Sequence, residues 1–249
     1  MRIEVRDAAD RLEELSDALH SGAIAEIILT KDDVPVARLL PVRLEFEIAG
    51  GFDRQTLYFY ATEAPDYHAN SSEGINCDLP GFLDILPSGA SILEMGCGAG
   101  RDAAYMQGRG FLVEPTDGVA EMAELASIRL GRTVPVMLFD ELAAEARYDA
   151  VYASYSLLHV PRVALGDVLR RVWTALKPGG WHMATFKSGG KEGRDDLGRY
   201  FNYLSVAQAK DFYSKAGDWQ SLEFSEGAGA GYDGRISPWV NVIARKAPV

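Results

Sequence analysis

The chain contains 249 residues, of which 47% are hydrophobic and 24% charged, and its formal net charge is −11. This composition can bury a sizeable core and excludes a disordered chain, while the negative charge disfavours a general surface for nucleic acids or anionic membranes. The two cysteines, Cys77 and Cys97, lack zinc-ligand spacing, so we expect reduced thiols in a cytoplasmic protein and no metal site. The N-terminus lacks the apolar core of a signal peptide, and no apolar run approaches the length of a membrane span.

The first 45 residues are predicted to form a small α+β module with β-α-β-β order. Strands are expected at residues 3–5, 26–30 and 35–40. Between the first two strands, apolar residues at positions 8, 12, 15 and 19 recur with the spacing of one helix face. A unit of this size is only marginally stable by itself, and a second domain is expected to follow it.

The segment ILTKDDVPVARLLPV of this module, with its β-α-β-β layout, resembles the N-terminal part of Phd/YefM-type antitoxins. The resemblance implies a module that dimerises and binds operator DNA. However, the turn at Lys31-Asp32-Asp33 lacks the basic residues and the glycine of that family, and residues 2–43 carry six Arg and Lys against nine Asp and Glu. The toxin-binding tail of the family is also absent. We therefore expect a homodimer or a docking contact through this module rather than binding to nucleic acid.

The second domain is expected to span residues 46–249, with residues 46–88 as an N-terminal linker and lid segment. Gly50-Gly51 is a candidate flexible joint at its start. The stretch that follows is rich in tyrosine, including Tyr60 and Tyr67. These aromatic side chains are candidates for the wall of a binding site.

The most informative motif starts at Ile92, where a buried parallel strand is expected to end in an acidic residue, Glu94, and to run directly into a glycine-rich turn. Gly96, Gly98 and Gly100 leave a loop with few side chains, where the backbone can approach a ligand and a positive φ costs little. A pyrophosphate prefers bare amide donors, so Glu94 separates this motif from the G-x-G-x-x-G dinucleotide fingerprint. A ligand with an amino group or a sulfonium centre tolerates a carboxylate there.

The pattern E-x-G-x-G-x-G, followed by Arg and Asp, resembles motif I of the class I S-adenosylmethionine (SAM) methyltransferases in its GCGxGRD form. The alternative is an ordinary tight turn between a strand and a helix. The resemblance implies that the methionine part of SAM is lined by Glu94, Gly96, Cys97, Gly98, Gly100, Arg101 and Asp102.

Strands and helices alternate along the rest of the domain. Further strands are expected at residues 111–117, 135–140, 148–154 and 181–187, and a final pair without a helix between them at 221–226 and 239–245. Helices are expected at residues 80–86, 119–130, 165–176 and 205–217. The alternation implies a doubly wound, mostly parallel α/β sheet with right-handed crossovers. The methyltransferase resemblance implies a Rossmann-like sheet of seven strands with an antiparallel last strand.

Asp117 follows the second strand of the sheet and lies 23 residues after Glu94. A carboxylate at this strand end can accept both hydroxyls of a ribose, as in nucleotide-binding folds. The sequence TDGVAEMAELA resembles motif II of the same methyltransferases, although Val119 replaces a serine that is frequent in the family. The resemblance places Gly118 and Met122 at the cofactor too. The alternative is that an Asp before Gly only forms a turn.

A third group of candidates, Phe139, Asp140, Glu141 and Leu142, comes at the end of the third predicted strand. The resemblance implies that this group contributes to the cofactor site. Asp140 would bind the adenine amino group, and Phe139 or Leu142 would lie beside the ring. The alternative for Asp140 is a solvated residue at the start of a helix.

The segment ASYSLLHVPR after the fourth strand resembles the ASLLHVPR segment of many bacterial methyltransferases. It lies where the transferred methyl group would emerge, with Ser154 at the cofactor and His159 and Arg162 at the acceptor. His159 is a candidate proton acceptor, substrate ligand or structural hydrogen bonder. The other three histidines of the chain do not form a metal set with it.

Glycines, charges and aromatic residues interleave after the fifth strand, at residues 192–203, without a helical or strand period. Loops of this kind are usually functional or mobile, and GRYFNY resembles a segment of the same methyltransferase group. We expect a lid at residues 194–203 and an acceptor pocket formed by Arg199, Tyr200 and Tyr203 together with Tyr60 and Tyr67. Tyr60 and Tyr200 are candidate catalytic groups beside His159. The alternative is a surface loop whose aromatic side chains pack on the core.

These motifs together predict a SAM-dependent methyltransferase that moves a methyl group to a small-molecule acceptor. Such a displacement needs alignment and exclusion of water more than a catalytic triad. One alternative is an antitoxin-like DNA-binding regulator with a SAM-sensing or inactive second domain. A nicotinamide-dependent oxidoreductase is a second alternative, which Glu94 before the glycines disfavours.

Overall fold

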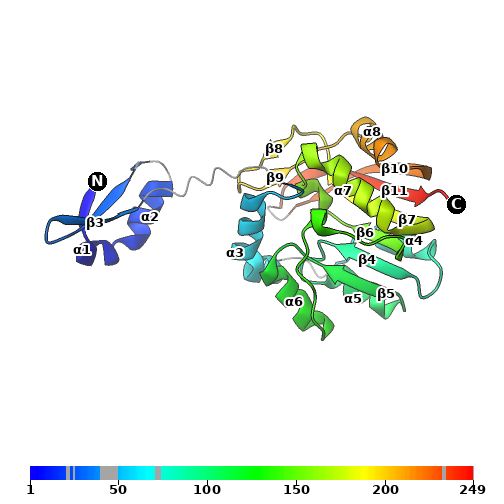
Figure 1. The fold of residues 1–249 in the computed structure, drawn as a ribbon, viewed down its shortest axis with the longest axis horizontal. Helices are drawn as coiled ribbons and strands as arrows, with labels where there is room; N and C mark the ends of the chain where they lie inside the picture. Colours follow the sequence, from blue (N-terminus) through cyan, green and yellow to red (C-terminus); the bar gives the residue numbers. More distant parts are fainter. Residues whose placement is uncertain (21–22, 25, 40–49, 71–73, 232–233, 249) are drawn as a thin grey trace. The chain divides into compact units, whose positions relative to one another are not determined.

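The computed structural model describes residues 1–20, 23–24, 26–39, 50–70, 74–231 and 234–248, with the backbone alone at residue 20 and at residues 65–70. Its contacts divide the chain into two units, Met1–Glu45 and Phe46–Val249 (Figure 1). Each unit has its own sheet and its own hydrophobic core.

The first unit is a three-stranded sheet with two short helices. Its elements are β1 (Arg2–Glu4), α1 (Val5–Ala9), α2 (Leu12–His20), β2 (Ile27–Lys31) and β3 (Val34–Leu39). β1 pairs in parallel with β2, and β2 pairs antiparallel with β3. The buried core of this unit consists of Ile3, Ala8, Leu15, Leu19 and Ile27.

The single helix predicted in this unit is divided in two. The Arg11 amide donates to the carbonyl of Ala8, three residues back, at 3.2 Å. This tighter turn interrupts the α-helical ladder. It also leaves Leu12 61% exposed, although its spacing placed it on the buried face.

The second unit is built around a six-stranded sheet with the order β10-β11-β7-β6-β4-β5. Its helices are α3 (Arg54–Asn70), α4 (Leu79–Asp84), α5 (Arg101–Gly108), α6 (Ala120–Leu130), α7 (Arg162–Ala175) and α8 (Val206–Ala216), with 3-10 turns η1 (Phe139–Glu141) and η2 (Leu157–His159). Its strands are β4 (Ser91–Met95), β5 (Leu112–Thr116), β6 (Tyr148–Ala153), β7 (Leu176–Lys187), β10 (Trp219–Ala230) and β11 (Ile236–Lys246), and a separate hairpin pairs β8 (Gly193–Arg194) with β9 (Tyr200–Phe201).

The pairing confirms the predicted Rossmann-like, mostly parallel architecture. β4 lies between β5 and β6 and is parallel to both, and β7 is parallel to β6. β11 runs antiparallel to both β7 and β10, as expected for the last strand. The chain passes from β5 on one side of β4 to β6 on the other, so the topological switch point lies at the carboxyl end of β4.

The strand predicted at residues 135–140 contributes only one isolated parallel bridge, between Asp117 and Val136. Pro135 has no N–H to donate to a ladder, and Val136 is 54% exposed at the edge of the sheet. The described part of the chain therefore shows six strands in this sheet and a bridge at the expected position of the seventh.

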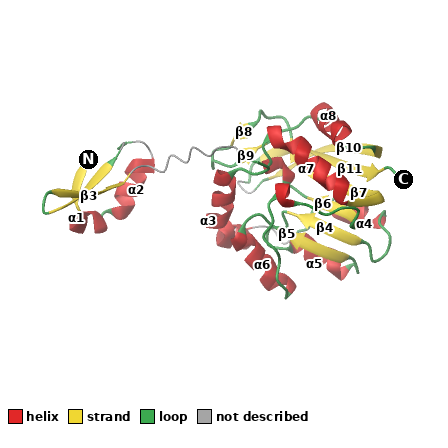
Figure 2. Cartoon of the chain, in the orientation of Figure 1, coloured by secondary structure: helices red, strands yellow, loops and turns green. Residues whose placement is uncertain are grey.

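Helices cover both faces of the sheet (Figure 2). Successive residues of a strand point to opposite faces. Accordingly, Leu93 belongs to the cluster that α7 and α8 cover, and Ile92 to the cluster beneath α4 and α5. This two-layer burial makes the carboxyl ends of β4 and its neighbours a rigid base for a site.

Helix α3 occupies part of the segment that the sequence predicts to be a linker. The apolar residues at positions 57, 60, 61 and 64 recur at helical spacing and pack in one cluster. Pro65, however, lies in the helix interior, where proline usually breaks a helix. Asp53 anchors the first turn, because it accepts from the Thr56 amide at 2.8 Å and from the Arg194 guanidinium at 2.9 and 2.8 Å. This anchor ties α3 to the β8–β9 hairpin.

Candidate active site

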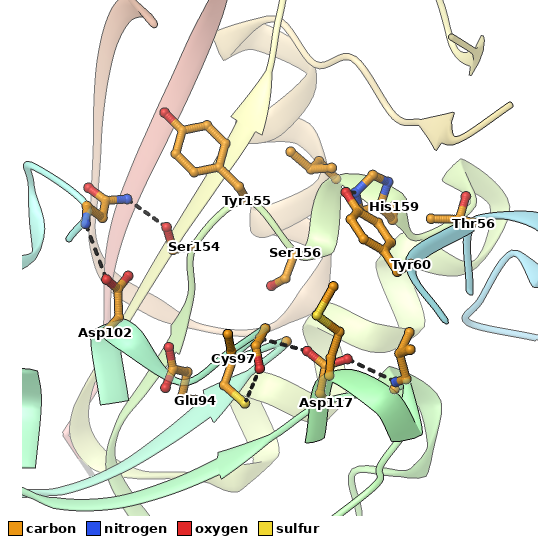
Figure 3. Close-up of a pocket in the computed structure, with 18 of the residues that line it drawn as sticks. Thr56, Tyr60, Glu94, Cys97, Asp102, Asp117, Ser154, Tyr155, Ser156 and His159 are labelled. Carbon is orange, nitrogen blue, oxygen red and sulfur yellow. Dashed lines mark hydrogen bonds between the residues drawn. The ribbon is translucent and has the colours of Figure 1, made fainter. Parts of the chain in front are cut away.

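A pocket of about 650 Å³ lies at the carboxyl ends of β4, β5, β6 and β7 (Figure 3). Figure 3 shows Glu94, Asp102 and Asp117 on one side of it, and Tyr60 with His159 on another. The lining also includes residues of α3, the β8–β9 hairpin and β11. Segments far apart in the sequence therefore meet at this edge of the sheet.

The glycine-rich turn has the conformation that the sequence predicts. Gly96, Gly98 and Gly100 all have positive φ values, of 76°, 53° and 75°. A Cβ atom on Gly98 would meet no protein atom within 4 Å, because it would point into open space, whereas one on Gly96 would lie 2.4 Å from Cβ of Ser156. Gly100 packs against Ala126 and does not line the pocket. Two of the three glycines therefore form the pocket surface, and the third lets α5 begin.

Glu94 is a buried acid at the end of the central strand. Its side chain is 3% exposed, and among the described residues Oε2 has no hydrogen-bond partner. Burial, followed by the charges of Asp102 and Asp117, raises the pKa of Glu94 well above its usual range. A buried carboxylate oxygen without a partner is costly. A ligand with N–H donors or positive charge would remove that cost.

Asp117 joins the end of β5 to the glycine turn. Its Oδ2 accepts from the Gly98 amide at 2.8 Å, and its Oδ1 accepts from the Val119 amide at 2.9 Å. Burial raises the pKa of Asp117 to about 6, against the lowering effect of these amides. Each oxygen keeps a second lone pair, so the carboxylate can still accept from a pair of hydroxyls.

Asn76, which precedes β4, completes this side of the pocket together with Asp102 and Ser154. Asp102 accepts from the Tyr152 hydroxyl at 2.7 Å and from the Asn76 amide at 3.3 Å. The Asn76 side chain donates to Oγ of Ser154 at 2.7 Å. Burial raises the pKa of Asp102. Asn76 carries no sequence signal that we recognised, although Asp102 and Ser154 do.

Apolar side chains from three segments form a slot next to Asp117. Met122 and Val119 come from the start of α6, Leu57 from α3, Leu138 from the position before η1, and Phe139 from η1 itself. Besides the acids and glycines already described, the pocket is also lined by these predicted cofactor residues: Cys97, Arg101, Gly118, Met122 and Phe139. A slot of this kind suits a flat, apolar ring.

The structure corrects the prediction for Asp140, Glu141 and Leu142, none of which lines the pocket. Asp140 accepts from the Gly51 amide at 2.8 Å, and Glu141 accepts from the Leu138 amide at 2.7 Å. Leu142 is 3% exposed and belongs to the core. The η1 turn directs these side chains away from the pocket, which sequence spacing alone does not reveal.

His159 and Tyr60 form a hydrogen-bonded pair at another part of the pocket. Nδ1 of His159 lies 2.7 Å from the carbonyl oxygen of Tyr200, so this nitrogen carries the proton. Nε2 is then an acceptor, and it lies 3.0 Å from the Tyr60 hydroxyl. Burial, and then the charges of Arg199 and Lys187, lower the pKa of His159 to about 4 despite the Tyr200 carbonyl. The imidazole is neutral at neutral pH, with its basic nitrogen toward Tyr60.

Two cations line the pocket beside this pair. Arg199 is 2% exposed, donates to Asp195 through Nε at 2.9 Å and Nη2 at 2.7 Å, and lies 3.4 Å from the Tyr60 hydroxyl. Lys187 is the last residue of β7, and its Nζ lies 4.3 Å from the centre of the Phe201 ring. Arg199 was predicted at the acceptor and Lys187 was not. The position of Lys187 at the carboxyl end of a predicted strand was a sequence signal that could have identified it.

The structure does not bring Arg162, Tyr200 or Tyr203 to the pocket lining. The Tyr200 hydroxyl bonds to Glu192 and accepts from the Arg162 amide, while the Arg162 guanidinium donates to the Tyr203 carbonyl at 2.7 Å. Neighbouring residues of a strand alternate in direction, so Phe201 of β9 lines the pocket, as Arg199 just before the strand does, whereas Tyr200, 4% exposed, does not.

The segment predicted as a lid is anchored at several points. The Arg194 guanidinium binds the buried Asp53, and the Tyr200 amide donates to Oγ of Thr56 at 2.8 Å. For Tyr200 and Tyr203 this packing agrees with the alternative of a loop held on the core. The side chain of Tyr67 lies outside the described part of the chain.

Sequence reasoning missed much of the remaining wall. These lining residues are Phe52, Thr56, Leu57, Tyr155, Ser156, Phe201, Ser237 and Trp239, together with Gly229–Gly231. Tyr155 has a φ of 48°, which is strained for a residue with a side chain. Among the described residues, no helix has the length and apolar character of a membrane span, and no group of three or more His, Cys, Asp or Glu side chains is arranged to hold a metal ion.

Comparison with known proteins identifies the family of this domain. The methyltransferase domain family matches residues 71–215, more than half of the chain, and the chain therefore belongs to it. Ubiquinone biosynthesis O-methyltransferases from Paraburkholderia phytofirmans and Burkholderia cenocepacia are 35% and 36% identical to it over 104 residues, which are 38% of this chain. The match covers 43% of the length of either relative, so the chain spans less than half of these curated proteins.

Solved structures show the same fold. Phosphoethanolamine N-methyltransferase 2 from Haemonchus contortus, in complex with S-adenosyl-L-methionine, has a TM-score of 0.63 at 16% identity and covers 84% of this chain and 62% of its own. A SAM-dependent methyltransferase from Methanosarcina mazei has a TM-score of 0.59 at 16% identity and covers 68% of this chain and 98% of its own. At these identities the likeness concerns the fold.

Proposed function

We propose that the domain of residues 46–249 is a SAM-dependent methyltransferase that acts on a small-molecule acceptor. The observation that carries the proposal is the buried Oε2 atom of Glu94, which has no partner among the described residues and lies beside a glycine turn. Membership of the methyltransferase domain family supports the same function. The named activities of the relatives support methyl transfer as the reaction class.

The donor set fits SAM, and each part of that molecule has a matching group. Glu94 would accept from the amino group, and the Gly96–Gly98 turn would leave room for the methionine chain. Asp117 would accept from the two ribose hydroxyls. The apolar slot with Met122 and Phe139 would hold the adenine ring.

The chain's own groups have to align the acceptor, exclude water and receive its proton. Bound SAM supplies a methyl group on a positively charged sulfur. An acceptor atom attacks the methyl carbon in line with the carbon–sulfur bond, and the sulfur leaves. We assign His159 as the proton acceptor, acting through Tyr60, because Nε2 is unprotonated and lies 3.0 Å from the Tyr60 hydroxyl. The acceptor's proton would pass to the Tyr60 oxygen while the Tyr60 proton passes to Nε2. His159 is held for this task by the Tyr200 carbonyl.

Calorimetry of the full chain with SAM, S-adenosylhomocysteine (SAH) and NADH tests the proposal. We expect SAM and SAH to bind and NADH not to bind. Binding of NADH alone would instead identify an oxidoreductase. Salt-sensitive, sequence-selective binding of duplex DNA would favour the antitoxin-like regulator, whether or not SAM binds.

For the first unit we propose a role in homodimerisation or docking, in a cytoplasmic protein. The edge strand β3 supports this proposal, because Val34 and Val36 are 60% and 54% exposed. An exposed edge strand is a template for pairing with another chain. Both cysteines, Cys77 and Cys97, are free thiols, in keeping with a reducing compartment. The resemblance of this unit to antitoxins stays a prediction.

A further inference from the structure

The pocket has a cationic end that the proposed cofactor contacts do not use. Lys187 Nζ lies 4.3 Å from the centre of the Phe201 ring, and Cζ of Arg199 lies 5.1 Å from the same centre. Two positive charges therefore meet at one aromatic ring. The Arg199 guanidinium also forms an ion pair with the carboxylate of Asp195.

The effect of these cations is visible at the neighbouring imidazole. The His159 ring centre lies 4.6 Å from that of Phe201. Burial is the largest cause of the lowered pKa of His159. The positive charges of Arg199 and Lys187 lower this pKa further, whereas the single negative charge of Asp195 raises it. This end of the pocket therefore has a positive potential.

Negative charge is located elsewhere in the pocket. Among the described lining residues the carboxylates are Glu94, Asp102 and Asp117, which belong to the ends of β4 and β5 and the start of α5. Lys187 ends β7, two strand positions from β4. Adjacent strands are about 4.8 Å apart, so these three carboxylates belong to a different part of the pocket from Lys187.

A flat apolar wall lies directly beside the cationic end. Trp239 on β11 is the register partner of Lys187 on β7, so the two side chains share one face of the sheet. A Cβ atom on Gly227 would lie 2.2 Å from the Trp239 ring, and one on Gly229 would lie 3.6 Å from its nitrogen. The glycines of β10 thus leave the space that the indole occupies.

We infer that Lys187, with Arg199 beside it, forms an anion subsite, and that the methyl acceptor is a flat small molecule bearing a carboxylate or phosphate group. The anion would bind at Lys187 and the flat part would lie against Trp239. This inference rests on the proposed function and names the acceptor class for the same pocket. Lys187 is partly buried, and its ammonium group can make a charge-assisted contact with such an anion.

The test uses the full chain saturated with SAH, titrated by calorimetry with matched pairs of equal shape. Benzoate is compared with benzamide, 1-naphthoate with 1-naphthamide, and phenyl phosphate separates phosphate from carboxylate recognition. We expect at least one anion to bind about tenfold more tightly than the neutral member of its shape class, and more weakly as salt rises. Equal binding of acids and amides, or no binding of any anion, overturns the inference.

Variants assign the preference to Lys187. Lys187→Met should abolish the preference for the anion, whereas Lys187→Arg should keep it. Lys191→Met is the matched control, because Lys191 is exposed and does not line the pocket. Retention of the full preference in a folded Lys187→Met protein overturns the inference. SAH affinity is measured for every variant, so loss of SAH binding by the wild-type chain would count against the proposed function instead.

Discussion

The two ends of the pocket are built in different ways. The end formed by Glu94, the glycine turn and Asp117 comes from two consecutive strands and the loops that follow them. The end formed by Tyr60, His159 and Lys187 combines side chains from α3, η2 and β7, and β9 and β11 extend it. The first end is therefore a local property of the chain, and the second is a product of tertiary packing. We expect damage at the first end to remove cofactor binding, and damage at the second to spare it.

The largest expected effect is that of Gly98→Val. The new side chain would enter the open space of the pocket at a residue with a φ of 53°. We expect loss of SAH affinity by more than about a hundredfold, from steric exclusion and backbone strain together. Calorimetry with SAH measures this loss.

Gly108→Val is the matched control for this variant. Gly108 ends α5, and a Cβ atom there would meet nothing within 4 Å. The control should keep SAH binding. Normal SAH affinity in a folded Gly98→Val protein would show that the glycine turn is not part of the cofactor site.

The second prediction compares two buried histidines. Burial lowers the pKa of both His159 and His182 to about 4, from an ordinary value of 6.5. A group whose pKa is lowered by folding contributes stability that is present above pH 6.5 and is lost as pH falls toward 4. Each histidine should therefore remove about 3 kcal/mol of unfolding free energy across that interval. Urea unfolding at several pH values measures the slope.

Replacement by glutamine separates the roles of the two residues. His159→Gln and His182→Gln should each flatten the loss of stability between pH 6.5 and 4 relative to wild type. His182 bonds to Val151 and Tyr213 within the core and does not line the pocket. Methyl transfer should therefore fall by about 10²–10⁴-fold in His159→Gln alone. Equal turnover in both variants would exclude His159 as the proton acceptor.

The third prediction contrasts two acids that the sequence presents alike. Asp117→Ala should weaken SAH binding by about 1.5–3 kcal/mol, because hydrogen bonds to a charged group are lost. Asp140→Ala should leave SAH affinity nearly unchanged, because Asp140 binds the Gly51 amide instead of lining the pocket. Calorimetry on both variants tests the contrast. Equal losses would restore Asp140 to the cofactor site.

The smallest expected effect on the pocket comes from removal of residues 1–43. The pocket is lined by residues of the second unit, so SAH affinity should stay at the wild-type value. Light scattering should show a change in oligomeric state if the edge strand β3 mediates self-association. If the number of chains per complex stays the same after the deletion, the dimerisation role is excluded. Tight, sequence-selective DNA binding by the full chain would remove the docking role as well.

Several features of the site could be predicted because they depend on neighbouring residues. A buried strand, an acid and spaced glycines are read within a dozen positions, and the structure places Glu94, Gly96 and Gly98 at the pocket as expected. Asp140 was predicted at the cofactor but lies outside the pocket lining, because its carboxylate accepts from the Gly51 amide. Tyr200 was predicted at the acceptor but also lies outside the lining, whereas its neighbours Arg199 and Phe201 line the pocket.

The sequence by itself determined the alternating α/β pattern from residue 91 onward, the glycine turn and the acid at the end of β4. These features follow from local rules of burial, backbone conformation and turn chemistry. Only the tertiary structure decided that α3 continues past Pro65, that His159 meets Tyr60, and that Lys187 stands opposite Trp239. Those outcomes depend on strand register and on contacts between segments up to 144 residues apart, such as Thr56 with Tyr200. No local pattern specifies a partner at that distance, because its position depends on how the whole sheet is assembled.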